Sequence, residues 1–126
     1  MSEQSEQKEA TLRIYLGTDR DKIVLSDGKE YILYPLDLTD IGDLEERFGE
    51  NYSKIATGQN VKAGIYILWL AVRKNYLTEE QILAQQWKIS ERQVGMWFSI
   101  GEFEKLTQIV PRIFSFSGLE VDLKNG

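Results

Sequence analysis

The sequence predicts an α+β fold, in which an N-terminal β-hairpin or small antiparallel sheet precedes a bundle of four to five α-helices. Two observations predict it. Near the N-terminus, segments with the alternation of β-strands flank an Asp-Gly turn, and the remaining chain carries apolar residues at helical spacing, divided by capping residues. At 126 residues we expect a single domain over 11–114, between a disordered segment 1–10 and a flexible tail 115–126.

The expected strands lie in the first 35 residues. Apolar side chains alternate over 12–16, and two β-rich runs follow at 23–25 and 31–34. The runs are joined through Asp27 and Gly28, and Asp-Gly is a strong hairpin signal because both central positions of the tightest turn need a positive φ. Pro35 closes the second strand of the hairpin, since it has no N–H to donate.

The first helix is expected to begin at Thr39, a good N-cap, and to end before Gly49, which suits the position after a helix. Asp40 and Asp43 complement the positive end of the helix dipole. The acidic residues are expected mainly on a solvated face. The opposite, apolar face is formed by Ile41, Leu44 and Phe48.

The second helix, over about 61–76, is the expected core element. It is apolar nearly all round, which is typical of a centrally packed helix. Its main apolar stripe contains Val61, Ile65, Leu68, Trp69, Val72 and Tyr76. The apolar residues outside that stripe are Ile67, Leu70 and Ala71.

Capping boxes mark the next two helices. Thr78 with Gln81, and Ser90 with Gln93, have the spacing at which each side chain accepts the other residue's free backbone N–H. They predict helices at about 79–87 and 91–98. Helical spacing then continues in Phe103, Leu106, Val110 and Ile113. Pro111 predicts that this last helix is disturbed.

The segment 78–97 also resembles a helix-turn-helix reader of DNA. Ala84 allows close helix approach, Ile89 lies in the turn, and Val94 and Trp97 anchor the reading helix to the core. The outward residues of that reading helix are Glu91, Arg92, Gln93 and Met96. The DNA-facing residues in this interpretation are Lys88, Arg92 and Gln93.

Charge opposes that interpretation. The net charge of the chain is −5, and the stretch 37–50, with six acidic residues and one arginine, accounts for all of it. No basic stripe exists that could displace phosphate counterions. Lys88 occupies the turn position usually held by glycine, so it must adopt a left-handed conformation or make a different turn. We therefore expect nucleic acid not to be the partner, and a regulator remains the alternative.

The composition removes other function classes. The chain has no cysteine and no histidine, so it lacks the usual zinc ligands and the base of Ser-His and Cys-His catalysis. The spacing of Asp37, Asp40 and Asp43 is not that of a calcium loop. We expect no enzyme, no metal and no cofactor. The longest uncharged apolar run, 63–72, has ten residues, and a membrane span needs roughly 20, so no membrane contact is expected.

Aromatic residues suggest a candidate binding site. Trp69, Trp87 and Trp97 all lie in apolar helical patterns, and core packing explains them most simply. Aromatic residues also dominate interface hot spots. We hypothesise that Trp87, Met96 and Phe98 form a patch for a partner or for self-association.

The order of these parts resembles the tail assembly chaperones of long-tailed bacteriophages and prophages, over about 23–113. The resemblance rests on a hairpin with DGKEY, a short acidic helix with LEERFG, an apolar helix with a basic end, and LTEEQ opening a further helical half. It implies a non-enzymatic protein of the host cytoplasm. Its implied partner is the tape-measure protein, with tail-tube protein and self-association as further expectations. A structural tail component is a third interpretation.

Overall fold

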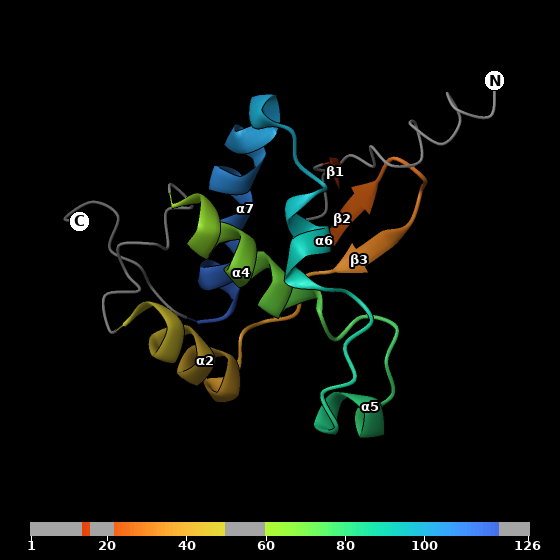
Figure 1. The fold of residues 1–126 in the computed structure, drawn as a ribbon, viewed down its shortest axis with the longest axis vertical. Coiled ribbons are helices and arrows are strands. Elements are labelled where there is room, and N and C mark those ends of the chain that lie inside the picture. Colours follow the sequence, from red (N-terminus) through yellow and green to blue (C-terminus); the bar gives the residue numbers. More distant parts are fainter. Residues whose placement is uncertain (1–13, 16–21, 50–59, 119–126) are drawn as a thin grey trace.

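The structure is a computed structural model that describes residues 14–15, 22–49 and 60–118 (Figure 1). The α+β class is confirmed. A three-stranded antiparallel sheet in the order β1-β2-β3 contains β1 (Ile14–Tyr15), β2 (Lys22–Leu25) and β3 (Glu30–Ile32). The helices are α2 (Leu38–Phe48), α4 (Val61–Val72), α5 (Glu79–Leu83), α6 (Glu91–Gly95), the 3₁₀ helix η1 (Ile100–Glu102) and α7 (Phe103–Phe116). The segment expected to be disordered, 1–10, lies outside the described residues.

The β2–β3 hairpin is confirmed, but its turn differs from the predicted one. Gly28 donates to the Leu25 carbonyl at 2.8 Å, and Leu25 donates to the Lys29 carbonyl at 2.9 Å. Gly28 has φ 89°, whereas Asp27 does not have a positive φ. This pattern is a three-residue loop with a glycine bulge, in which only the last loop residue needs the left-handed region. Asp27 instead uses its carboxylate to accept the Lys29 N–H at 2.9 Å.

The start of α2 corrects the predicted N-cap. Asp37, and not Thr39, caps the helix: its carboxylate accepts the Asp40 N–H at 2.8 Å, and Asp40 returns the bond to the Asp37 N–H at 3.0 Å. The predicted end is correct, because Gly49 has φ 82° and donates to the Glu45 carbonyl at 2.7 Å. The helix therefore starts two residues earlier than its threonine suggests.

Helix α4 is the centre of the core, as predicted. From Ala63 onward its buried residues lie on every side, and they include Ile67, Leu70 and Ala71, which have no exposed surface. It packs against α2, α6, α7 and β3 (Figure 1). The ends of the predicted stripe are wrong, because Val61 and Tyr76 are both more than half exposed. The helix ends at Val72, and the turn that follows places Tyr76 at φ 63°.

Helix α7 continues through Pro111 to Phe116, so the proline does not end the helix, although it leaves one helical hydrogen bond unmade. A proline inside a helix costs about 3 kcal/mol. Here its neighbours Ile109, Val110 and Ile113 are fully buried, and packing against α4 stabilises the helix more than the local loss weakens it. The flexible tail predicted from residue 115 also begins too early, because α7 continues to Phe116. Residues 119–126 lie outside the described residues.

The two helices after α4 are shorter than predicted, although both capping boxes are confirmed. Helix α5 ends at Leu83 instead of 87, and Gln85 follows in a left-handed conformation at φ 55°. Helix α6 ends at Gly95 instead of 98. No residue of α5 is buried, so no packing extends it beyond the turns that its cap supports.

Candidate partner-binding surface

Helices α5 and α6 do not form the pair that a helix-turn-helix requires. Helix α5 buries no residue and stands away from the body, whereas α6 lies against α4 (Figure 1). Ile89, Val94 and Trp97 are buried, as predicted. Ala84 is exposed, so its predicted packing between the two helices is wrong. The residues 84–90 form a long connection between the helices, whereas the motif has a turn of about three to four residues.

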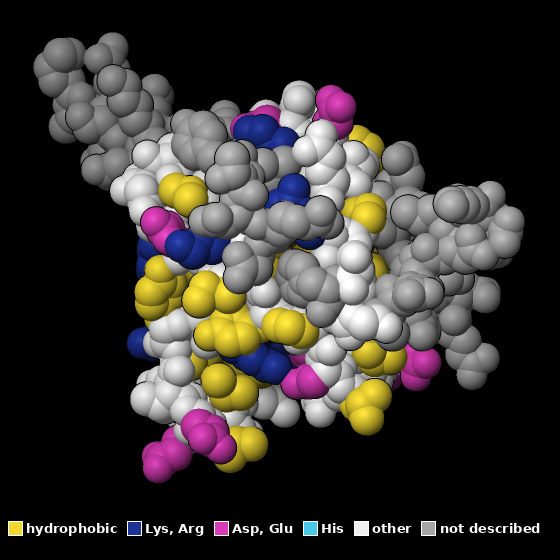
Figure 2. Space-filling model, turned by 180° about the vertical axis from the view of Figure 1, so that it is seen from behind, with side chains coloured by type: hydrophobic (Ala, Val, Ile, Leu, Met, Phe, Trp, Pro, Cys, Tyr) yellow, Lys and Arg dark blue, Asp and Glu magenta, His cyan; other side chains and the backbone are white. Residues whose placement is uncertain are grey.

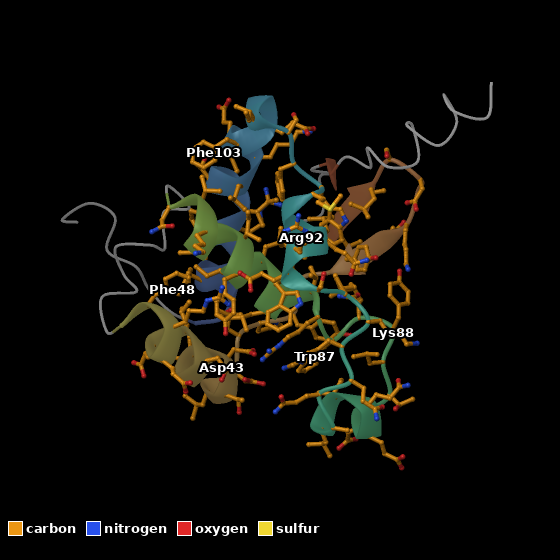
Figure 3. The ribbon with its side chains drawn as sticks, in the orientation of Figure 1. Asp43, Phe48, Trp87, Lys88, Arg92 and Phe103 are labelled. Atoms are coloured by element: carbon orange, nitrogen blue, oxygen red, sulfur yellow. The ribbon has the colours of Figure 1, made fainter. Side chains whose placement is uncertain are left out.

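The residues proposed to face DNA are exposed but do not make a phosphate-binding stripe. Lys88, Arg92 and Gln93 are all exposed, and Figure 3 shows Lys88 in the loop and Arg92 on α6, well apart. Lys88 is not left-handed; the turn uses Gln85 instead. Two exposed glutamates, Glu79 and Glu80, lie nearby on α5. Such a charge pattern disfavours a phosphate backbone.

Trp87 packs the connection after α5 against the core. Its half-buried ring packs edge-on against Trp69, with ring centroids 6.1 Å apart. The guanidinium carbon of Arg73 lies 4.4 Å from the Trp87 ring centre and 4.8 Å from that of Trp69. The Trp69 indole donates to the Ile89 carbonyl at 2.8 Å. These contacts hold the loop that leads into α6 (Figure 3).

The acidic residues of α2 are paired with cations of the α4 end. Arg73 Nη2 lies 2.7 Å from Asp40 Oδ1 and 3.3 Å from Asp43 Oδ2, and Lys74 Nζ lies 2.7 Å from Asp37 Oδ2. Asp40 is only 1% exposed, an exception to the expected solvated face, on which Asp37, Glu45 and Glu46 do lie. The described residues contain no cluster of metal-ligand type. Asp37, Asp40 and Asp43 therefore serve as helix caps and ion-pair partners.

Burial and pairing shift two carboxyl groups in opposite directions. Burial raises the pKa of Asp40, and the bonds from the Asp37 cap and Arg73 only partly oppose that rise. At Asp37, burial is outweighed by the hydrogen bonds from Lys74 and from the Asp40 backbone, which together lower its pKa. The same helix end thus holds one carboxyl that resists ionisation and one that is held ionised.

The predicted patch of Trp87, Met96 and Phe98 is only partly a surface. Met96 is more than half exposed at the end of α6. Trp87 is committed to Arg73 and Trp69, and Phe98 packs against the core. Of the three, Met96 alone offers most of its side chain to a partner.

A different group of apolar side chains is exposed, and sequence reasoning did not single it out. Ile32 on β3 is 44% exposed, Tyr76 after α4 is 56% exposed, and Leu83 on α5 is 77% exposed. We call these three the β3–α5 surface. Figure 2 shows hydrophobic side chains gathered on this side of the molecule, over β3 and towards α5. One signal was available: Ile82 and Leu83 are adjacent in a short helix and cannot both face inward.

Tyr76 is fixed beside the hairpin. Its hydroxyl donates to the Glu30 carbonyl, and Lys29 Nζ lies 4.9 Å from its ring centre. Beside it, Asn75 donates to the Ile32 carbonyl at 2.8 Å and accepts the Ile32 N–H at 2.9 Å. The exposed ring of Tyr76 is therefore held in place before any partner arrives.

Comparisons with known proteins add no relative. No protein-family model matches the chain, and neither a curated protein nor a solved structure was found to match it. Among the described residues, no helix has the length and apolar character to cross a membrane.

Proposed function

We propose that the chain is a non-enzymatic tail assembly chaperone of a long-tailed bacteriophage or prophage, which binds the tape-measure protein while the tail is built in the bacterial cytoplasm. The order of hairpin, acidic helix, apolar helix and capped helical half supports this proposal. The observation that carries it is the β3–α5 surface, because a chaperone for a long helical chain needs exposed apolar side chains.

The β3–α5 surface has the physical properties of a helix-binding face. Tyr76 is a large aromatic side chain held by Glu30 and Lys29, so ordering it on binding costs little. Exposed glutamates and lysines around it supply the polar rim that keeps a complex in solution. Ile32, Tyr76 and Leu83 would each bury apolar surface on contact with an amphipathic helix of the partner.

Helix α5 gives this surface an element that is incomplete on its own. It buries none of its residues, and left-handed residues flank it at Tyr76 and Gln85. Leu83 is 77% exposed, so contact with another molecule would bury apolar surface that the described residues leave open.

The test is co-expression of the full chain with the tape-measure protein of the same genome, the long helical protein expected from the neighbouring reading frame. We expect the two to co-purify and the tape-measure protein to stay soluble. The double variant Ile32→Thr/Leu83→Gln should reduce the soluble tape-measure protein several-fold. Ile100→Gln is the matched control, because Ile100 is 97% exposed but lies in η1, outside the β3–α5 surface.

Three results would contradict the proposal. The first is unchanged tape-measure solubility with the double variant. The second is a gel shift with DNA that survives moderate salt, which would favour a regulator, since weak non-specific binding fades as salt rises. The third is recovery of the chain from finished virions by mass spectrometry, which would favour a structural tail component.

A further inference from the structure

A second candidate site lies between α2, α4 and α6. None of the three side chains of the β3–α5 surface belongs to these helices. The site is a hollow of about 350 Å³. Its lining residues are Arg47, Lys62, Ile65, Glu91, Arg92 and Gly95. Each of the three helices contributes one cation, and α6 contributes the single carboxylate.

Arg47 is held by two neighbours, whereas Lys62 and Arg92 have no ion-pair partner among the residues that the structure describes. Arg47 Nη1 lies 2.8 Å from Glu91 Oε1, and its guanidinium carbon lies 4.5 Å from the centre of the Tyr66 ring. In the described part of the chain, neither Lys62 nor Arg92 makes an ion pair or a side-chain hydrogen bond. The hollow therefore holds two positive charges that no described residue pairs with, in a chain whose net charge is −5.

The floor of the hollow is apolar. Ile65 is half-buried there, and Gly95 on α6 faces it. A Cβ at Gly95 would meet Ile65 Cδ1 at 3.4 Å, so the glycine leaves the space above the isoleucine open. A ligand group with a short methylene stem and an anionic end fits this combination of an apolar lining and surrounding cations.

We propose that this hollow binds paired carboxylates, presented as two glutamates one turn apart on a helix of a partner protein. Arginine matches a carboxylate in geometry and charge, and the hollow has room for about two side chains rather than an extended polymer. A phosphate backbone is disfavoured, because three cations around one hollow do not form the long basic stripe that successive phosphates need.

The site goes beyond the proposed function and is tested without the tape-measure protein. The probe is a fluorescent, alanine-rich helical peptide with glutamates at i and i+4, compared with the same peptide carrying glutamines. Fluorescence anisotropy with the full chain at low salt should show roughly tenfold tighter binding of the glutamate peptide. Lys62→Gln/Arg92→Gln should remove that preference.

Two variants separate the hollow from general electrostatics. Lys29→Gln/Lys88→Gln lowers the net charge equally but outside the hollow, and it should leave binding within about twofold. Gly95→Leu keeps every charge and fills the space above Ile65, and it should weaken binding severalfold. Circular dichroism checks that each variant keeps its helices.

The proposal is overturned if the two peptides bind equally, or if the control pair of lysines matters as much as the hollow pair. It is also overturned if a single-stranded DNA oligonucleotide displaces the glutamate peptide at moderate salt. Ile32→Thr/Leu83→Gln should leave peptide binding unchanged, so failure at this site is distinguishable from failure of the proposed function.

Discussion

The surroundings of Arg73 and the α5 segment are joined through Trp87, yet they differ in which side chains they bury and which they expose. Around Arg73 the chain buries charge: Asp40 is almost fully enclosed, and the guanidinium lies against two tryptophan rings. In α5 it exposes apolar surface, because no residue of the helix is buried and Leu83 faces solvent. Buried charge fixes the position of α2 on α4, whereas exposed apolar surface is available to a partner.

Breaking the Arg73 cluster gives the largest expected effect. Arg73→Ala should lower the free energy of unfolding by about 3–5 kcal/mol, because the buried Asp40 carboxylate loses its close cation and keeps only Lys74 Nζ, at 3.9 Å. Chemical denaturation measures the loss. The matched double variant Asp40→Asn/Arg73→Met should recover at least half of it, since it removes both charges and keeps a cap acceptor at residue 40. A loss below about 1 kcal/mol for Arg73→Ala would show that the cluster does not fix the fold.

The capping boxes of α5 and α6 test this difference directly, because the same hydrogen bonds start an unburied helix in one case and a packed helix in the other. Ser90→Ala should cost about 1 kcal/mol of global stability, since α6 is packed through Val94. Thr78→Ala should cost less than half of that, because α5 opens without exposing a core. Denaturant unfolding gives the global values, and native-state hydrogen exchange should show faster exchange in α5 alone. Equal global costs would mean that α5 is part of the cooperative core.

How much the sequence predicts follows the same division. Local signals found the hairpin, both capping boxes and the all-round apolar α4, because turn chemistry, caps and periodicity act within a few residues. The burial of Asp40 was missed, because it depends on Arg73, 33 positions away in the chain. Pro111 is a related case: its local cost is visible in the sequence, whereas the packing that keeps the helix continuous is not.

The candidate surface was harder to predict than the fold. Trp87 and Phe98 looked like interface residues because of their type, yet three-dimensional contacts with Arg73 and the core occupy them. Tyr76 looked like the end of a buried stripe, and a left-handed turn exposes it instead. Exposure of a single apolar side chain depends on where a helix stops, and that boundary is the least certain feature of a sequence pattern.

The smallest expected effect concerns Asp37, the half-exposed cap at the edge of the Arg73 region. Asp37→Asn keeps an N-cap acceptor but removes the ion pair with Lys74. Because the pKa of Asp37 is lowered in the folded state, its ionised form contributes stability above its ordinary pKa of 3.8, and that contribution is lost as pH falls through the lowered pKa. The stability difference between wild type and variant should therefore stay constant near neutral pH and shrink in acid.

That difference should remain below about 1 kcal/mol, because solvent and salt screen a half-exposed pair. Asp40 titrates with the opposite sign: its raised pKa means that the stability favoured by its protonated form is lost as pH rises through the raised value. Repeating the acid titration of Asp37→Asn in an Asp40→Asn background removes this coupled group. If the stability difference then no longer depends on pH in acid, the pH response comes from the buried Asp40 carboxyl. The Arg73 region would then end at Asp40 and would not include Asp37.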